Sequence, residues 1–219
     1  MAKLDKWRYF HGENSITFCL FSTFNKKQIS SLLSHAQWHI PDNITLVPDK
    51  TKAEQIQYLH LFPNFGKRYG YGEPDVVIIT DNFVIYVEVE LADFSKRRIS
   101  DCFIKQMKMF VKLGNELHNK KITRLRKKFI GNSGYSFFGG KGLRRIFKQI
   151  KEKDRKPCFL VISESNSLNA FHRLRDKLGL SSDVLFGCVG FRKIKWIKGS
   201  GISNVINDAL EKKRIRFKL

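Results

Sequence analysis

Three carboxylates, Asp75, Glu88 and Glu90, occupy a short stretch whose pattern predicts two adjoining strands. Residues 74–80 and 83–91 are rich in Val, Ile and aromatic side chains, and a turn-forming Asp-Asn pair separates them. Side chains alternate along a strand, so Glu88 and Glu90 share one face. A hairpin places the start of its first strand beside the end of its second. We therefore expect Asp75 to lie near both glutamates.

Carboxylates gathered at one point repel one another, and burying them without a partner is costly. A divalent cation removes this conflict, because Mg²⁺ prefers oxygen ligands and keeps several bound waters. A metal held in this way activates water and neutralises charge that develops on a phosphate, which phosphodiester hydrolysis requires. The alternative is that Glu88 and Glu90 simply face solvent at a strand end. The Pro-Asp pair on the partner strand favours the metal site.

The surrounding pattern predicts the elements that position these side chains. A helix is expected from Thr51 to about Leu61, and a long helix from about Ser95 to Leu117, with Gln106 within its apolar stripe. The order of elements predicts an α/β (α+β) fold with a central mixed sheet flanked by helices. Further strands are expected at 15–24, 157–163, 184–191 and 193–197, and further helices at 26–36, 168–177 and from about 202.

The spacing of Pro74-Asp75 and Glu88-Val89-Glu90 resembles the signature of the PD-(D/E)xK nuclease superfamily. This group includes many restriction endonucleases, Holliday-junction resolvases and repair nucleases. The resemblance implies a restriction-endonuclease-like core, which is a helix, a three-stranded meander, a helix and a further strand. It extends from about residue 51 to residue 191, with residues 65–71 expected as the first core strand.

The resemblance also implies roles for single residues. Asp75 and Glu88, with the carbonyl of Val89, would bind Mg²⁺, for which Mn²⁺ can substitute. Glu54 on the first helix and Gln106 on the helix after the motif would complete the site. Each has a structural alternative, since Glu54 is also placed to form a capping box and Gln106 needs a hydrogen-bond partner wherever it is buried.

Glu90 stands where the superfamily carries lysine. Some restriction enzymes of the superfamily have glutamate at this place and remain active, so Glu90 is expected to bind the metal or orient water. The other interpretation is an inactive descendant. Lys96 and Lys105, in the neighbouring segment, are further candidates for the missing amine.

The chain of 219 residues has a formal net charge of +21, which favours a polyanionic partner. Residues 120–156 contain fourteen Lys or Arg and two acids, together with glycines and aromatic residues. This clustering favours an arm that grips nucleic-acid phosphates, whereas most charge runs are only solvated faces. The basic tail at 212–218 adds a second patch. The residues expected to bind nucleic acid are Arg124, Arg126, Lys127, Lys128, Lys141, Arg144 and Arg145.

The length favours one compact domain, with residues 1–50 as an N-terminal elaboration and residues 51–219 as a nuclease-like domain with a basic insertion at 118–156. No run of about 18 apolar residues predicts a membrane-spanning helix, and no secretory signal is visible. The four cysteines lie far apart in apolar runs, which favours buried, reduced thiols in a cytoplasmic protein.

These features predict a Mg²⁺-dependent DNA endonuclease acting on double-stranded DNA. A homodimer, in which each subunit cuts one strand, is one expected arrangement. The alternative is a catalytically inactive nucleic-acid-binding protein on the same fold, in which the basic arm carries the function. RNA is an alternative ligand in both cases, because the aromatic residues within 129–138 could stack on unpaired bases.

Overall fold

The structure is a computed structural model of the 219-residue chain. It describes residues 7–11, 17, 20–21, 25–44, 48, 55–61, 73–94, 99–118, 139–165, 167–191, 194 and 214–218. The elements in chain order are β1 (Trp7–His11), α2 (Lys26–Ser34), β2 (Gln37–His39), β3 (Ile56–Leu61), β4 (Val76–Thr80), β5 (Phe83–Asp93), α3 (Asp101–His118), α5 (Gly139–Glu152), β6 (Lys156–Ser165), α6 (Leu168–Leu178), β7 (Phe186–Gly190) and β8 (Arg214–Lys218).

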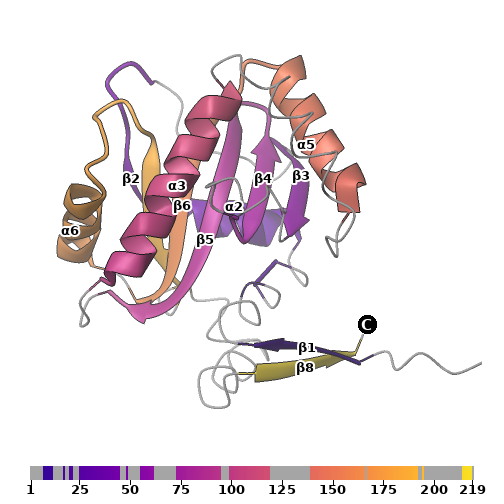
Figure 1. Ribbon diagram of the computed structural model, residues 1–219, viewed down its shortest axis with the longest axis horizontal. Coiled ribbons are helices and arrows are strands. Elements are labelled where there is room, and N and C mark those ends of the chain that lie inside the picture. Colours follow the sequence, from indigo (N-terminus) through magenta and orange to yellow (C-terminus); the bar gives the residue numbers. More distant parts are fainter. Residues whose placement is uncertain are drawn as a thin grey trace, which may run out of the picture.

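Six strands form one mixed sheet in the order β2-β7-β6-β5-β4-β3 (Figure 1). Strands β3, β4 and β5 are an antiparallel meander, in which Val76 of β4 pairs with Val87 of β5. Strands β5, β6 and β7 are parallel, and the short β2 pairs antiparallel with β7 at one edge. The predicted α/β fold with a mixed sheet and helices is confirmed.

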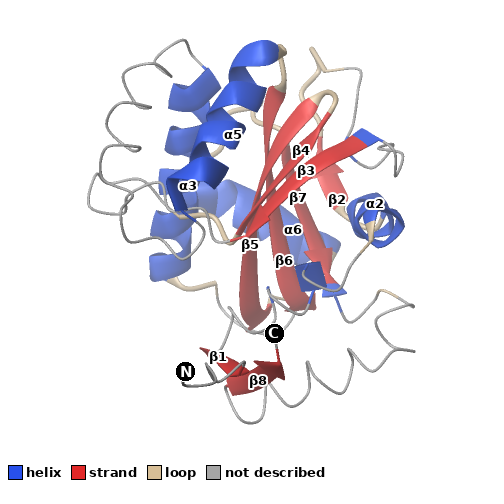
Figure 2. Cartoon of the chain, turned by 90° about the vertical axis from the view of Figure 1, so that its right-hand side faces the viewer, coloured by secondary structure: helices blue, strands red, loops and turns tan. Residues whose placement is uncertain are grey.

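Alternating side chains of the sheet enter two separate cores, one on each face. Val77 and Tyr86 pack with residues of α3, α5 and α6, whereas Ile78 and Val87 pack with residues of α2. Figure 2 shows α3 and α5 on one side of the sheet and α2 on the other. Because both faces are covered, β4 is buried along its whole length, which accounts for its continuous apolar sequence.

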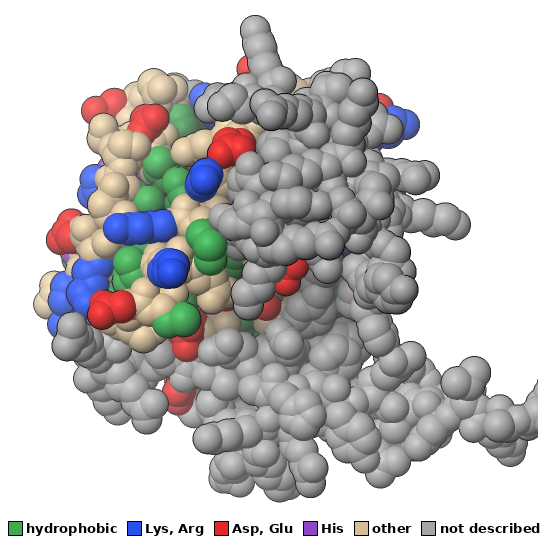
Figure 3. All heavy atoms as spheres, viewed as in Figure 1, with side chains coloured by type: hydrophobic (Ala, Val, Ile, Leu, Met, Phe, Trp, Pro, Cys, Tyr) green, Lys and Arg blue, Asp and Glu red, His purple; other side chains and the backbone are tan. Residues whose placement is uncertain are grey.

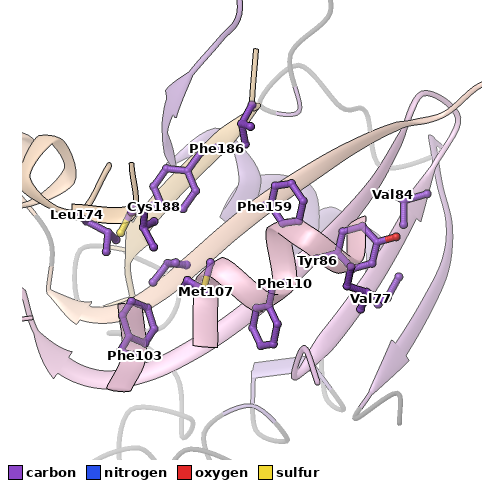
Figure 4. Packing of buried hydrophobic residues seen from close by; sticks show 14 of the residues in the cluster. Val77, Val84, Tyr86, Phe103, Met107, Phe110, Phe159, Leu174, Phe186 and Cys188 are labelled. Atoms are coloured by element: carbon purple, nitrogen blue, oxygen red, sulfur yellow. The ribbon is translucent and has the colours of Figure 1, made fainter. Parts of the chain in front are cut away.

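Helix α3 approaches the sheet closely at Gly114. A Cβ atom at this position would lie 2.5 Å from the ring of Phe159, which itself stacks on Tyr86 with ring centroids 5.6 Å apart. Met107 and Phe110 continue the same contact along the helix (Figure 4). The predicted apolar stripe is confirmed within this helix, where Phe103, Phe110, Leu113 and Leu117 are buried; its first predicted member, Ile99, is buried but precedes α3.

A buried arginine before β6 fixes the turn of the β4–β5 hairpin. Arg155 is 2% exposed, and its guanidinium donates to the carbonyl of Thr80 at 2.6 Å, to the side chain of Gln57 at 2.9 Å and to the carbonyl of Gln149. Burial lowers the pKa of Arg155, and the nearby charge of Asp81 opposes that shift. This cation of the basic stretch therefore ties together β3, α5 and the hairpin.

Two elements predicted before the β4–β5 hairpin are wrong in the described residues. The helix expected to end near Leu61 is replaced there by β3, in which buried Ile56 and His60 contact the interior while Gln57 is exposed. Pairing with β4 outweighs the helical propensity of this segment. The strand expected at 15–24 is helical at its described residues, Thr17, Leu20 and Phe21.

For the closing helix expected from about residue 202, residues 202–213 lie outside the described residues, and residues 214–218 form β8, which pairs with β1. The strand expected at 65–71 and most of the one expected at 193–197 lie outside the described residues. The hairpin strands, α2, α3, β6, α6 and β7 are confirmed, although α3 begins at Asp101 rather than near Ser95.

The first 50 residues supply parts of the main fold, because β2 joins the six-stranded sheet and α2 packs into its core.

Of the cysteines, Cys158 and Cys188 are buried free thiols as predicted, whereas Cys102 is exposed at the start of α3, where the amphipathic helix turns that position outward. Cys19 lies outside the described residues. Within the described part of the chain, no helix has both the length and the hydrophobicity needed to cross a membrane.

Candidate metal centre

Asp75 lies immediately before β4, where its carboxylate extends the hairpin ladder. Its Oδ2 accepts a hydrogen bond of 2.8 Å from the backbone N–H of Val89. β4 begins at Val76, which pairs with Val87, so β5 continues past the start of its partner. A carboxylate oxygen thus takes the place of the backbone carbonyl that the next ladder position would supply.

Proline explains why the carbonyl of Val89 differs from others in the ladder. Continued by one pair, the register of β4 and β5 sets Pro74 opposite Val89. In an antiparallel hydrogen-bonded pair each residue donates its N–H to the carbonyl of the other. Proline has no N–H, so Pro74 has no hydrogen to donate to the Val89 carbonyl. The Pro-Asp sequence therefore denies the Val89 carbonyl a donor from Pro74, while Asp75 accepts from the Val89 N–H.

Glu88 is the buried carboxylate of the site. Its side chain is 4% exposed, and its Oε1 accepts a hydrogen bond from the side-chain amide of Gln106 on α3. Tyr86, two residues earlier on β5, belongs to the core that α3 covers, so alternation places Glu88 under the same helix. The structure therefore brings together the predicted pair of Glu88 and Gln106.

Glu90 follows on the same face of β5 by the same alternation and is half-buried. The register of β5 with β6 pairs it with Ser163, a fully buried hydroxyl. Ser163 hydrogen bonds to Cys188, and this bond lowers the thiol pKa, which burial raises to about 12. Ser163 was not predicted from the sequence, although a hydroxyl at the end of an otherwise apolar strand was a signal for it.

The fit of a metal ion depends on which donors are present. Asp75 and Glu88 supply carboxylate oxygens, and Val89, the residue after Glu88, supplies a carbonyl oxygen, so the donors are the hard oxygens that Mg²⁺ prefers. Glu90 shares the face, but among the residues that the structure describes no three His, Cys, Asp or Glu side chains form a group that could hold a metal. The fitting set is thus two carboxylates and one carbonyl.

The other residues predicted for this site lie away from Glu88 or outside the described residues. Glu54 and Lys96 are outside the described residues. Lys105 is exposed on α3, beside Lys108 and Lys112, and Figure 3 shows Lys and Arg side chains over the face formed by α3 and α6. Lys105 therefore does not take the place of the missing lysine at the buried Glu88.

The predicted basic arm is a helix in its second half. The glycine-rich stretch lies in α5, whose Ile146 and Phe147 are buried in the core. The guanidinium of Arg145 lies 4.1 Å from the centre of the Tyr58 ring, so this cation packs on the edge strand β3. The structure describes the helical backbone of Lys141 and Arg144 but not their side chains, and Arg124, Arg126, Lys127 and Lys128 lie outside the described residues.

Comparison of the chain with protein-family models, with curated proteins and with solved structures found no match.

Proposed function

We propose that the protein is a Mg²⁺-dependent DNA endonuclease that hydrolyses phosphodiester bonds at the open end of the β4–β5 hairpin. One observation carries this proposal: the carboxylates of Asp75 and Glu88 are each held by a defined donor, and the donor to Asp75 is the backbone N–H of Val89, the residue after Glu88. These carboxylate oxygens, together with the Val89 carbonyl to which Pro74 cannot donate, would form an oxygen donor set suited to Mg²⁺. Mn²⁺ is expected to substitute for Mg²⁺.

The order of elements supports the finer assignment of a restriction-endonuclease-like core. The meander β3–β4–β5 is followed by α3 and then by β6, which is the order that the resemblance to PD-(D/E)xK nucleases implies. β3 takes the place that had been assigned to residues 65–71. Asp75 then precedes the second core strand and Glu88 lies on the third, as in that superfamily.

Each side chain has a proposed task. Asp75, Glu88 and the Val89 carbonyl would hold the metal, which when bound supplies a Lewis acid and an activated water. Gln106 positions Glu88 through the hydrogen bond to Oε1. Glu90 orients the attacking water from the adjacent position on the same face. The net charge of +21 draws the DNA phosphates to the surface, and a homodimer would allow both strands to be cut.

A second candidate is a protein that binds nucleic acid without cutting it. It is favoured by the protein partners that both carboxylates already have, since Asp75 accepts from Val89 and the buried Glu88 accepts from Gln106. Glu90 in place of lysine agrees with this alternative. Under it, the basic surface carries the function and the carboxylates stabilise the hairpin.

Nicking of supercoiled plasmid separates the two candidates. The endonuclease is expected to nick plasmid with Mg²⁺ or Mn²⁺ and to stop in EDTA. A Glu90→Lys variant is expected to retain cleavage, because lysine would perform the water-orienting task that Glu90 performs here. Plasmid binding without nicking in either metal, by the wild type and by Glu90→Lys, would establish the second candidate.

A further inference from the structure

The two ends of the chain form a small sheet of their own. β1 and β8 pair antiparallel, and this ribbon is separate from the six-stranded sheet in hydrogen bonding (Figure 1). Its register pairs Trp7 with Lys218, Tyr9 with Arg216 and His11 with Arg214. Opposed residues of an antiparallel pair share a face, and so do positions two apart. These six residues therefore occupy one face, and each pair consists of one aromatic and one basic residue.

The other face of the ribbon has a different composition. Its register positions pair Arg8 with Phe217 and Phe10 with Ile215, so three of the four residues are apolar. The ten residues of both strands include four Lys or Arg and no acid. One face thus combines rings and cations in alternation, whereas the other is mainly apolar.

Alternating rings and cations match the chemistry of unpaired nucleic acid. Every base has an aromatic face, so rings stack on bases of any sequence while cations contact the phosphates. The rise of a strand puts successive aromatic positions on one face roughly 7 Å apart. In a duplex, the base faces are already stacked on one another and are closed to such a platform.

We propose that the face of the β1–β8 ribbon formed by Trp7, Tyr9, His11, Arg214, Arg216 and Lys218 binds single-stranded nucleic acid. The ribbon's use in holding an unpaired segment of the substrate rests on the proposed nuclease function. Binding itself requires no metal. An acidic protein segment would be attracted by the cations alone and would gain nothing from the rings.

The test measures binding of fluorescent oligo(dT) and of a duplex of matched length by anisotropy, in EDTA. The double variant Trp7→Leu/Tyr9→Leu is expected to bind oligo(dT) roughly tenfold or more weakly and the duplex unchanged. Phe10→Leu, an aromatic substitution on the opposite face, is the matched control and is expected to bind as the wild type does. Equal oligo(dT) affinity of the double variant and wild type would overturn the proposal. So would an equal loss on the duplex, or tighter binding of polyglutamate than of oligo(dT).

A second variant keeps the test decisive if the aromatic substitutions unfold the ribbon. Arg214→Gln/Arg216→Gln leaves the rings in place and is expected to reduce the slope of log affinity against log salt by about 1.4 for oligo(dT), since each lost phosphate contact removes about 0.7. An unchanged slope would overturn the proposal. Because oligo(dT) binding is measured in EDTA, it can be observed even if the nicking assay fails, so failure of the proposed nuclease and failure of the ribbon proposal are told apart.

Discussion

The side-chain amide of Gln106 donates a hydrogen bond to Oε1 of Glu88, so a residue early in α3 fixes the orientation of a buried carboxylate on β5. This contact joins the third strand of the meander to the helix that follows it. It also explains why an amide interrupts an otherwise apolar stripe, since no apolar side chain could donate to the carboxylate.

Gln106→Leu tests the strength of that contact. The substitution leaves the buried carboxylate without this donor, and we expect the free energy of unfolding to fall by about 1–3 kcal/mol. Urea denaturation measures the change. Lys105→Leu, at the exposed neighbouring position of α3, is the control and is expected to alter stability by less than about 0.5 kcal/mol. Equal stability of Gln106→Leu and wild type would show that the hydrogen bond contributes nothing.

Asp75 allows its structural and chemical tasks to be separated. Asp75→Ala removes the acceptor of the Val89 N–H, and we expect a loss of about 1–3 kcal/mol in urea denaturation. Asp75→Asn keeps an oxygen acceptor but loses the charge, so it is expected to remain close to wild type in stability while losing cleavage. If Asn and Ala destabilise the protein alike, the carboxylate charge, rather than the acceptor, supports the hairpin.

Gly114→Ala probes the close approach of α3 to the sheet. The added methyl would lie 2.5 Å from the Phe159 ring, and overpacking of this kind costs about 1–3 kcal/mol. We expect a lower thermal midpoint, measured by circular dichroism. Asn115→Ala, exposed one position later on the same helix, is expected to leave the midpoint unchanged or slightly higher. A midpoint for Gly114→Ala at or above that of Asn115→Ala would contradict the packing described.

His118 makes stability depend on pH. Burial lowers the pKa of His118 to about 4, while a hydrogen bond to the Arg155 backbone and the charge of Asp154 oppose part of that shift. The unfolded chain therefore binds more protons than the folded chain below pH 6.5, so stability falls as the pH decreases from 6.5 to about 4, by up to roughly 3 kcal/mol. His118→Gln is expected to flatten this part of the profile. His172→Gln, at an exposed position on α6, should keep the wild-type slope; identical slopes in all three proteins would refute the assignment.

The central part of the fold was predictable because local and tertiary preferences agree there. Alternating side chains, β-branched residues and a turn-forming pair predicted the β4–β5 hairpin. The same alternation predicted that Glu88 and Glu90 lie on one face of β5. β3 was mistaken for a helix because the residues of Ile56–Leu61 are compatible with both a helix and a strand. The segment is a strand because it pairs with β4, and that pairing cannot be read from the local sequence.

Long-range contacts were not predictable from the sequence. The pairing of β1 with β8 joins segments at opposite ends of the chain, and nothing local in either segment specifies its partner. Arg155 lies in the basic stretch 120–156, whose clustered charge favoured a phosphate-gripping arm, although it is buried and holds the hairpin turn. Its role depends on three acceptors that are distant in sequence. The hydrogen bond of Asp75 to Val89 likewise required knowledge of the register.

The initial rate of Mg²⁺-dependent plasmid nicking by Glu88→Gln, relative to wild type, tests the proposed site most directly. Glutamine preserves the size of the side chain and an oxygen acceptor for Gln106 but removes the charge. Glu164→Gln is the matched control, because this neighbour of Ser163 alternates to the opposite face of β6. We predict a rate at least roughly 100-fold lower for Glu88→Gln and an unchanged rate for Glu164→Gln. Nicking by folded Glu88→Gln at the wild-type rate would contradict the account.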